Sequence, residues 1–151
     1  MKRTPEPDRT LDTLRVEFAA RQASLNRLLD RFEAFGRAKR IPAAIQRDVH
    51  LALDEIVSNI IRHGSGVKPS CRIRVDVTFD GGVVSVEVVD NGRPFDPVGA
   101  ATPRARGSVL KRPSGGLGIR LVKGVMDEME YSRQRGANRL RMKRGVKSRR
   151  R

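Results

Sequence analysis

Residues 72–92, RIRVDVTFDGGVVSVEVVDNG, decide the fold of this chain. Apolar residues take every second position on both sides of Asp80-Gly81-Gly82, which is typical of two half-buried strands joined by a tight turn. We therefore expect an antiparallel hairpin with strands over 72–79 and 84–88. Because one face of this hairpin is apolar, other elements must cover it.

The segments before the hairpin predict two helices and one strand. Apolar residues spaced three and four apart predict helices over 25–35 and 42–62. Pro42 suits the first turn of the second helix, and the glycines that follow His63 suit its end. Alternating apolar and charged residues over 14–18 predict a first strand.

The segments after the hairpin predict a loop, a helix and a second hairpin. Residues 91–116 are rich in Gly, Pro and basic residues and lack periodicity, which is typical of functional or mobile segments. An apolar stripe from Ile119 to Met129 predicts a third helix, and 130–133 and 138–142 predict the hairpin. This order of elements predicts an α/β (α+β) two-layer sandwich, with a mainly antiparallel mixed sheet and helices packed on one face.

Positive charge is concentrated towards the end of the chain. The 151 residues carry a formal net charge of +15, and Lys and Arg exceed Asp and Glu by 2 over residues 1–103 and by 13 over residues 104–151. This basic block is either a solvated tail or an arm for a polyanion. Nucleic-acid binding is the weaker interpretation, because the chain has no Trp, one Tyr and no helix-turn-helix or RRM pattern.

Composition also excludes several classes of protein. No stretch approaches the roughly 20 apolar residues of a membrane-spanning helix, and residues 1–10 lack the apolar core of a signal peptide. The single cysteine, Cys71, excludes an internal disulfide and a cysteine-based zinc site. We therefore expect a cytoplasmic protein without membrane contact.

Three short motifs combine residue types that suit a nucleotide. Glu55 and Asn59 stand four apart on one helix face, where they could position a hydroxyl group and a Mg²⁺ ion. Asp90, after a valine-rich strand, could accept a hydrogen bond from an exocyclic amine, and Gly92 lets a flat ring approach the backbone. The glycines of residues 114–119 precede a helix, where backbone N–H groups favour phosphate. Taken singly, each motif also fits a solvated helix pair, an ordinary turn or a flexible loop.

Together the three motifs resemble the GHKL (Bergerat-fold) ATP-binding family. Its pattern is Glu-x-x-x-Asn on a helix, Asp-x-Gly after a strand and Gly-x-Gly at the start of a helix. Three longer stretches resemble the anti-sigma-factor serine/threonine kinases, the RsbW-like branch: LALDEIVSNIIRHG (51–64), VDNGRPFDP (89–97) and GGLGIRLVKGVMDEMEY (115–131). The resemblance implies a histidine-kinase-like ATP-binding domain over 11–144, between a flexible N-terminus (1–10) and a basic tail (145–151).

The resemblance assigns roles to the residues of the first two motifs. Asn59 corresponds to the Mg²⁺ ligand that bridges to the triphosphate. Glu55 corresponds to the general base that takes the proton of the attacking serine hydroxyl or water. Asp90 corresponds to the residue that binds the adenine amino group, with Gly92 beside it.

The third motif and the loop before it would surround the phosphates. Residues 98–113 would form an ATP lid, in which any of Arg104, Arg106, Lys111 and Arg112 could neutralise phosphate charge. The residues expected to contact ATP are Asn59, His63, Asp90, Gly92, Phe95, Arg112, Gly115, Gly116, Leu117 and Gly118.

The resemblance implies an ATP-binding anti-sigma regulatory factor that takes part in transcription regulation. Such a protein phosphorylates a serine or threonine of an anti-anti-sigma (STAS-type) protein, sequesters a sigma factor, uses ATP and Mg²⁺, and commonly forms a homodimer. The alternative is a non-catalytic ATP-binding module that sequesters a regulatory partner. We interpret His50 as a surface histidine and not as the phosphoacceptor of a sensor histidine kinase.

Overall fold

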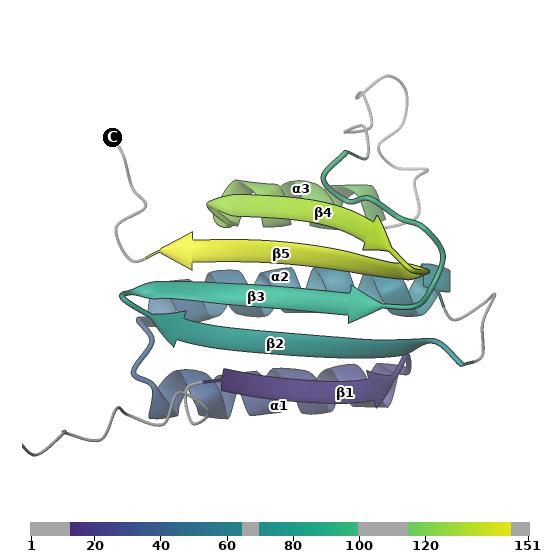
Figure 1. Ribbon diagram of the computed structural model, residues 1–151. Coiled ribbons are helices and arrows are strands. Elements are labelled where there is room, and N and C mark those ends of the chain that lie inside the picture. Colours follow the sequence, from purple (N-terminus) through teal and green to yellow (C-terminus); the bar gives the residue numbers. More distant parts are fainter. Residues whose placement is uncertain (1–12, 65–69, 100–114, 146–151) are drawn as a thin grey trace, which may run out of the picture.

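The computed structural model describes residues 13–64, 70–99 and 115–145. The elements in these ranges are β1 (Thr13–Ala19), α1 (Gln22–Ala38), α2 (Ala43–Gly64), β2 (Arg72–Asp80), β3 (Val83–Asp90), α3 (Gly115–Val125), β4 (Glu128–Gln134) and β5 (Ala137–Gly145). They form two layers, with the sheet in front and the helices behind it (Figure 1). The predicted two-layer sandwich is therefore confirmed.

The sheet has the strand order β1-β2-β3-β5-β4. The predicted hairpin is its centre, because Val75 of β2 lies opposite Val88 of β3, and Gly81 and Gly82 make the turn with positive φ angles of 59° and 79°. A mixed sheet was expected, but every pairing among the described strands is antiparallel.

One apolar core joins the two layers. Val75 and Val77 of β2, Leu28 of α1, and Val49 and Leu53 of α2 have no solvent exposure. Burial of each such side chain stabilises the fold by about 1.5–3 kcal/mol. Figure 1 shows α2 between α1 and α3, so the predicted buried stripe of α2 faces the middle of the sheet. No helix among the described residues has the length and apolar character needed to cross a bilayer.

The third helix is shorter than its apolar spacing predicted. α3 ends at Val125, and Met129 belongs to β4, where it pairs with Met142 of β5. The backbone N–H of Asp127 donates to the carbonyl of Lys143, so the chain joins the sheet directly after the helix. An inward position on β4 packs the partly buried Met129 against the same core, and strand pairing therefore overrides the helical spacing.

Several expectations fall on residues outside the described ranges. These are the flexible N-terminus, most of the 98–113 lid and the tail beyond residue 145. Exposure of His50 agrees with its interpretation as a surface histidine.

Candidate functional site

A pocket lies where α2 and β3 end and β5 begins. Its cavity volume is about 40 Å³, and the space beyond the cavity is open to solvent. Its apolar lining includes Ile56, Ile60, Val88 and Leu140. Its polar groups are few and include Asn59, Asp90 and Asn138. An apolar pocket with a few placed polar groups suits a flat heterocycle with polar edges.

Asp90, the last residue of β3, brings a buried carboxylate to this pocket. The Gly92 N–H donates to its Oδ1 at 2.9 Å, and Asn138 Nδ2 donates to the same oxygen at 3.0 Å. No described residue donates to Oδ2, so this oxygen is available to a ligand donor. Burial raises the pKa of Asp90, while the hydrogen bonds from Asn138 and Gly92 and the charge of Arg133 oppose the rise.

Asn138 is a residue of the site that the sequence analysis did not identify. It is 5% exposed and lies opposite Asp90 in the pairing of β3 with β5. Its Oδ1 accepts hydrogen bonds from the Tyr131 hydroxyl at 2.6 Å and from Arg133 Nη1 at 2.9 Å. Its Nδ2 also donates to the carbonyl of Arg93 at 2.6 Å. Asn138 therefore fixes both Asp90 and the segment that follows β3.

Asn59 on α2 is a buried amide with incomplete hydrogen bonding. Only 2% of the residue is exposed, its Oδ1 accepts a hydrogen bond from Arg62 at 3.2 Å, and its Nδ2 has no partner. A buried polar group without a partner typically costs about 1–3 kcal/mol. A ligand that engaged this amide would remove that cost.

Glu55 lies one helical turn before Asn59 and contacts α3, outside the set of residues that line the pocket. Gly118 makes room for it, because a Cβ atom at position 118 would overlap Glu55 Oε2 and lie 2.6 Å from its Cδ. The sequence predicted a phosphate contact for Gly118. That contact stays a prediction, and the neighbour that the structure describes is the proposed base.

His63 and Phe95 form one edge of the pocket. Their rings stack with centroids 6.2 Å apart, and Phe95 is 39% exposed. The stacked pair joins the end of α2 to the segment after β3. An exposed apolar ring at the mouth of the pocket suits contact with a ligand.

The segment after β3 is held at both of its ends. Asn138 binds its beginning, and Lys123 of α3 donates to the carbonyl of Val98 at 2.9 Å. Between these points the Asp96 carboxylate accepts from the N–H groups of Val98 and Gly99. The segment that leads to the predicted lid therefore has fixed contacts up to Gly99.

The structure thus brings four of the predicted ATP contacts, Asn59, His63, Asp90 and Phe95, to one pocket. Gly92 contributes through its hydrogen bond to Asp90. Gly115, Gly116 and Leu117 form the start of α3, where helix N–H groups are unpaired. Arg112 lies outside the described residues.

The described residues fit a magnesium ion only if the nucleotide shares in its coordination. They contain no group of three or more His, Cys, Asp or Glu side chains that could hold a metal. Mg²⁺ usually takes one or two protein oxygens together with water and substrate phosphates. Asn59 Oδ1 can supply such an oxygen once its bond to Arg62 is released.

Comparison with known proteins shows the family to which the chain belongs. Residues 18–144 match the family described as histidine kinase-like ATPase domain. The chain is 30% identical over 101 residues to the serine/threonine-protein kinase BtrW of Bordetella bronchiseptica, which covers 67% of this chain and 71% of that protein.

A solved structure has the same fold. The crystal structure of the RsbU and RsbW domains of Rv1364c from Mycobacterium tuberculosis superposes with a TM-score of 0.62 at 14% identity. The match covers 88% of this chain but only 31% of that longer chain. The sequence resemblance is thus confirmed, and the chain belongs to the histidine kinase-like ATPase (GHKL) family, in which a serine/threonine-protein kinase is among its relatives.

Proposed function

We propose that this chain is an ATP-dependent protein kinase that phosphorylates a serine or threonine of a STAS-type anti-anti-sigma protein and sequesters a sigma factor. The observation that carries the proposal is the order of groups along α2 and β3. Asp90 offers a free carboxylate oxygen in the pocket, Asn59 lies at the pocket on α2, and Glu55 follows one turn away. The order of these three residues matches the order of the groups they would contact. Asp90 would contact adenine, Asn59 the phosphates through Mg²⁺, and Glu55 the hydroxyl group of the protein substrate.

Each residue has a defined task in this proposal. Asp90 Oδ2 accepts a hydrogen bond from the adenine amino group, while Asn138 and Gly92 hold Oδ1. Asn59 Oδ1 would hold Mg²⁺, which would neutralise phosphate charge. Backbone N–H groups at the start of α3 contact the phosphates.

Glu55 acts on the protein substrate. Its carboxylate takes the proton of the substrate hydroxyl as the hydroxyl oxygen bonds to the γ-phosphorus, and the bond from that phosphorus to the β–γ bridging oxygen breaks to release ADP. Most of the catalysis in such a transfer is positioning and charge neutralisation. Gly118 contributes by leaving the space that the Glu55 carboxylate occupies.

Two measurements test the proposal. Calorimetric titration should show that the wild type binds ATP and that Asp90→Asn abolishes this binding. Removal of Mg²⁺ should weaken ATP binding by the wild type, because Asn59 is the expected Mg²⁺ ligand. Transfer of labelled γ-phosphate to a purified STAS-type protein should occur with the wild type and be lost in Glu55→Ala, which should still bind ATP. ATP binding without transfer, together with a stoichiometric complex, would favour the non-catalytic sequestering module. Unchanged transfer in Glu55→Ala would show that Glu55 is not the base.

A further inference from the structure

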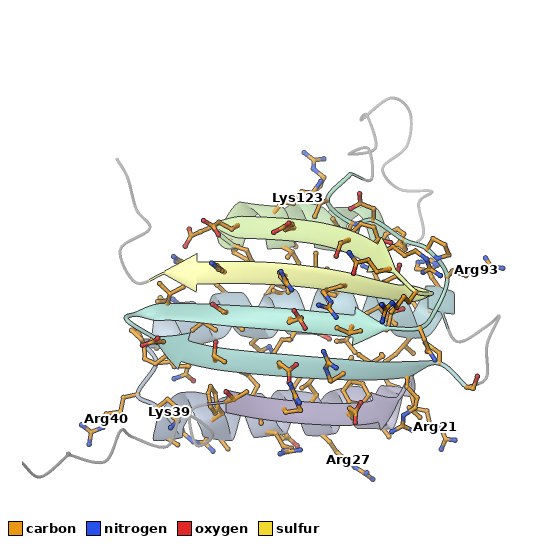
Figure 2. The ribbon with its side chains drawn as sticks, viewed as in Figure 1. Arg21, Arg27, Lys39, Arg40, Arg93 and Lys123 are labelled. Atoms are coloured by element: carbon orange, nitrogen blue, oxygen red, sulfur yellow. The ribbon has the colours of Figure 1, made fainter. Side chains whose placement is uncertain are left out.

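Five arginines, which we name the site-end arginines, gather at the end of the sheet that holds the pocket. Arg21 follows β1, Arg72 begins β2, Arg93 follows β3, Arg139 lies near the start of β5, and Arg135 is in the turn between β4 and β5. Figure 2 shows Arg21 and Arg93 at this end, pointing away from the body of the molecule, with Lys39 and Arg40 at the opposite end.

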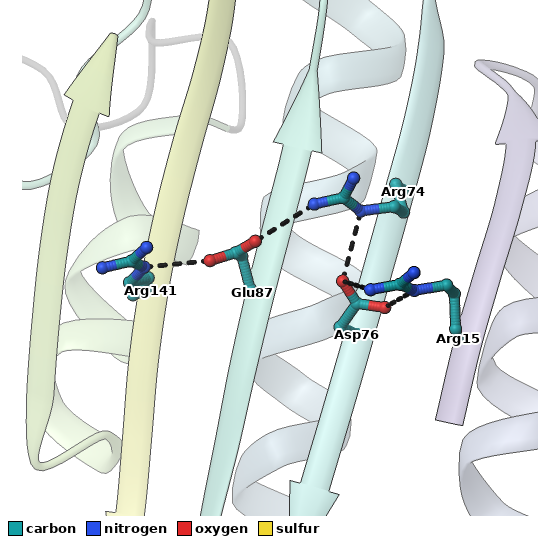
Figure 3. A network of polar contacts seen from close by, with 5 residues as sticks. All are labelled: Arg15, Arg74, Asp76, Glu87 and Arg141. Atoms are coloured by element: carbon teal, nitrogen blue, oxygen red, sulfur yellow. Dashed lines mark hydrogen bonds and ion pairs between the residues drawn. The ribbon is translucent and has the colours of Figure 1, made fainter. Parts of the chain in front are cut away.

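The site-end arginines differ from Arg15, Arg74 and Arg141 because they have no acidic partner. Arg15, Arg74 and Arg141 on the open face of the sheet form a ladder with Asp76 and Glu87, with contacts of 2.6–3.2 Å (Figure 3). None of the site-end arginines forms an ion pair with a residue that the structure describes.

Compensation is also present at the other end of the sheet. There Arg144 contacts Asp48 at 2.9 Å and Asp127 at 3.7 Å, and Lys143 lies 3.9 Å from Glu128. Among the arginines of the described strands, those without an acidic partner therefore lie at the pocket end. Like charges that gather without partners repel one another, and an anionic ligand removes that repulsion.

The distance over which the site-end arginines are spread indicates the size of an anionic ligand that could neutralise them. The arginines are distributed over all five strands of the order β1-β2-β3-β5-β4, and four strand spacings of about 4.8 Å give a width of about 19 Å. This exceeds the Debye length of about 8 Å at physiological ionic strength, so the outer charges act independently of one another. A single triphosphate in the pocket cannot neutralise them all, whereas the surface of a macromolecule can.

We propose that the site-end arginines are the docking surface for an acidic face of the protein substrate. This inference rests on the proposed function, because a protein hydroxyl must approach the pocket at this end. Arginine suits the task, since its planar guanidinium pairs with carboxylates through two parallel hydrogen bonds. A protein is favoured over a nucleic acid because the arginines lie on the ends of separate strands and not on one helix or β-ribbon that could enter a groove.

The test compares two triple variants of the full chain with the same change of net charge. Arg72→Glu/Arg135→Glu/Arg139→Glu reverses three site-end arginines. Arg31→Glu/Arg40→Glu/Arg47→Glu is the control, and it also contains one arginine with positive φ, Arg40 at 55° against Arg135 at 52°. The probes are a fluorescein-labelled 20-residue Glu/Ser peptide and a 20-base-pair DNA duplex, each measured by anisotropy over a series of salt concentrations.

We expect the site-end variant to bind the acidic peptide at least about tenfold more weakly than the wild type, since each exposed pair contributes a factor of roughly two to five. The control variant should keep most of the affinity. Equal loss in both variants, or no loss in the site-end variant, would overturn the proposal. Loss of DNA binding alone would assign the surface to nucleic acid and would also overturn it.

Calorimetric titration of ATP into the same proteins separates this inference from the proposed function. The site-end variant should bind ATP as the wild type does, because its substitutions leave the residues of the pocket unchanged. If the wild type binds no ATP, the proposed function fails, whatever the peptide shows. If ATP binds and the peptide does not discriminate the two variants, only the docking surface fails.

Discussion

Gly118→Ala tests the packing of α3 on the proposed base. In an unhindered helix, alanine is more stable than glycine by about 0.5–1 kcal/mol. At position 118 the new Cβ would overlap Glu55 Oε2 and lie 2.6 Å from its Cδ, so the carboxylate must move or α3 must shift. A forced rotamer change costs about 0.5–1.5 kcal/mol, and overpacking costs about 1–3 kcal/mol. We therefore expect Gly118→Ala to be neutral or destabilising by up to about 2 kcal/mol.

The control is Gly124→Ala in the same helix, where a Cβ would meet nothing within 4 Å. Gly124→Ala should gain the stability that alanine gives a helix. The free energies of unfolding of Gly118→Ala and Gly124→Ala should therefore differ by about 1–3 kcal/mol, or several degrees in the midpoint of thermal unfolding. Glu55→Ala removes the obstacle, and the double variant Glu55→Ala/Gly118→Ala should then regain the alanine benefit.

Urea unfolding of the wild type, Glu55→Ala, Gly118→Ala and the double variant gives the coupling energy between residues 55 and 118. A coupling of about 1–2 kcal/mol is expected, within the range measured for residues in contact. In phosphotransfer, Gly118→Ala should reduce the rate with little change in ATP affinity, because it displaces the base and leaves Asp90 and Asn138 in place. Gly118→Ala as stable as Gly124→Ala, with no coupling to Glu55, would refute the contact.

Three further predictions concern the pocket and its support. The raised pKa of Asp90 means that the folded state holds the proton more tightly than the unfolded chain, so this group stabilises the fold at low pH and the contribution is lost as pH rises through the raised pKa. Asp90→Asn should therefore be at least as stable as the wild type at pH 7 but should lose ATP binding. Calorimetry measures the binding, and denaturation at several pH values measures the stability. Lower stability of Asp90→Asn at pH 7 would contradict the burial argument. Asn138→Ala should destabilise the fold by about 1–3 kcal/mol and weaken ATP binding, as measured by urea unfolding and titration, whereas an unchanged affinity would show that Asp90 needs no support. Arg144→Ala, at a side chain only 11% exposed that bonds Asp48 at 2.9 Å, should cost about 1–3 kcal/mol in urea unfolding and leave ATP affinity unchanged; a change in affinity would mean that this contact also shapes the pocket.

Local periodicity accounts for the parts of the fold that the sequence predicted. The alternation over 72–90 requires only neighbouring residues and a glycine turn, and β2 and β3 form as expected. The prediction that Met129 belongs to a helix was wrong because its conformation depends on a distant strand. Its spacing from Val122, Val125 and Met126 continues a helix, but pairing with Met142 places it in a strand. A spacing rule cannot weigh such a partner thirteen residues away.

Asn138 was missed for a similar reason. Its inward position could have been read from the alternation with Leu140 and Met142, which marks a polar residue on the apolar side of a strand. The hydrogen bond from Asn138 to Asp90 could not be predicted from the sequence. Asp90 is 48 residues earlier in the chain, and only the pairing of β3 with β5 makes the two residues neighbours. The motif residues themselves were identified by resemblance, whereas the partners that orient them depend on long-range topology.

Two departures from ordinary packing lie at the pocket, and a third lies where α3 meets Glu55, one helical turn before Asn59. Asn59 has a buried amide nitrogen without a partner, Asp90 has a buried carboxylate, and Gly118 lacks the side chain that would stabilise its helix. The first two departures lower the stability of the isolated chain, because stability alone would favour an apolar residue at each of these positions. Gly118 instead leaves the space that the Glu55 carboxylate occupies. Each also suits one part of the proposed reaction: coordination near the phosphates, binding of the adenine amine and placement of the base. Buried polar groups that lower stability and lie at one pocket are typical of a ligand site. Nucleotide binding should therefore raise the midpoint of thermal unfolding of the wild type, and the increase should be smallest in the variants that remove these groups.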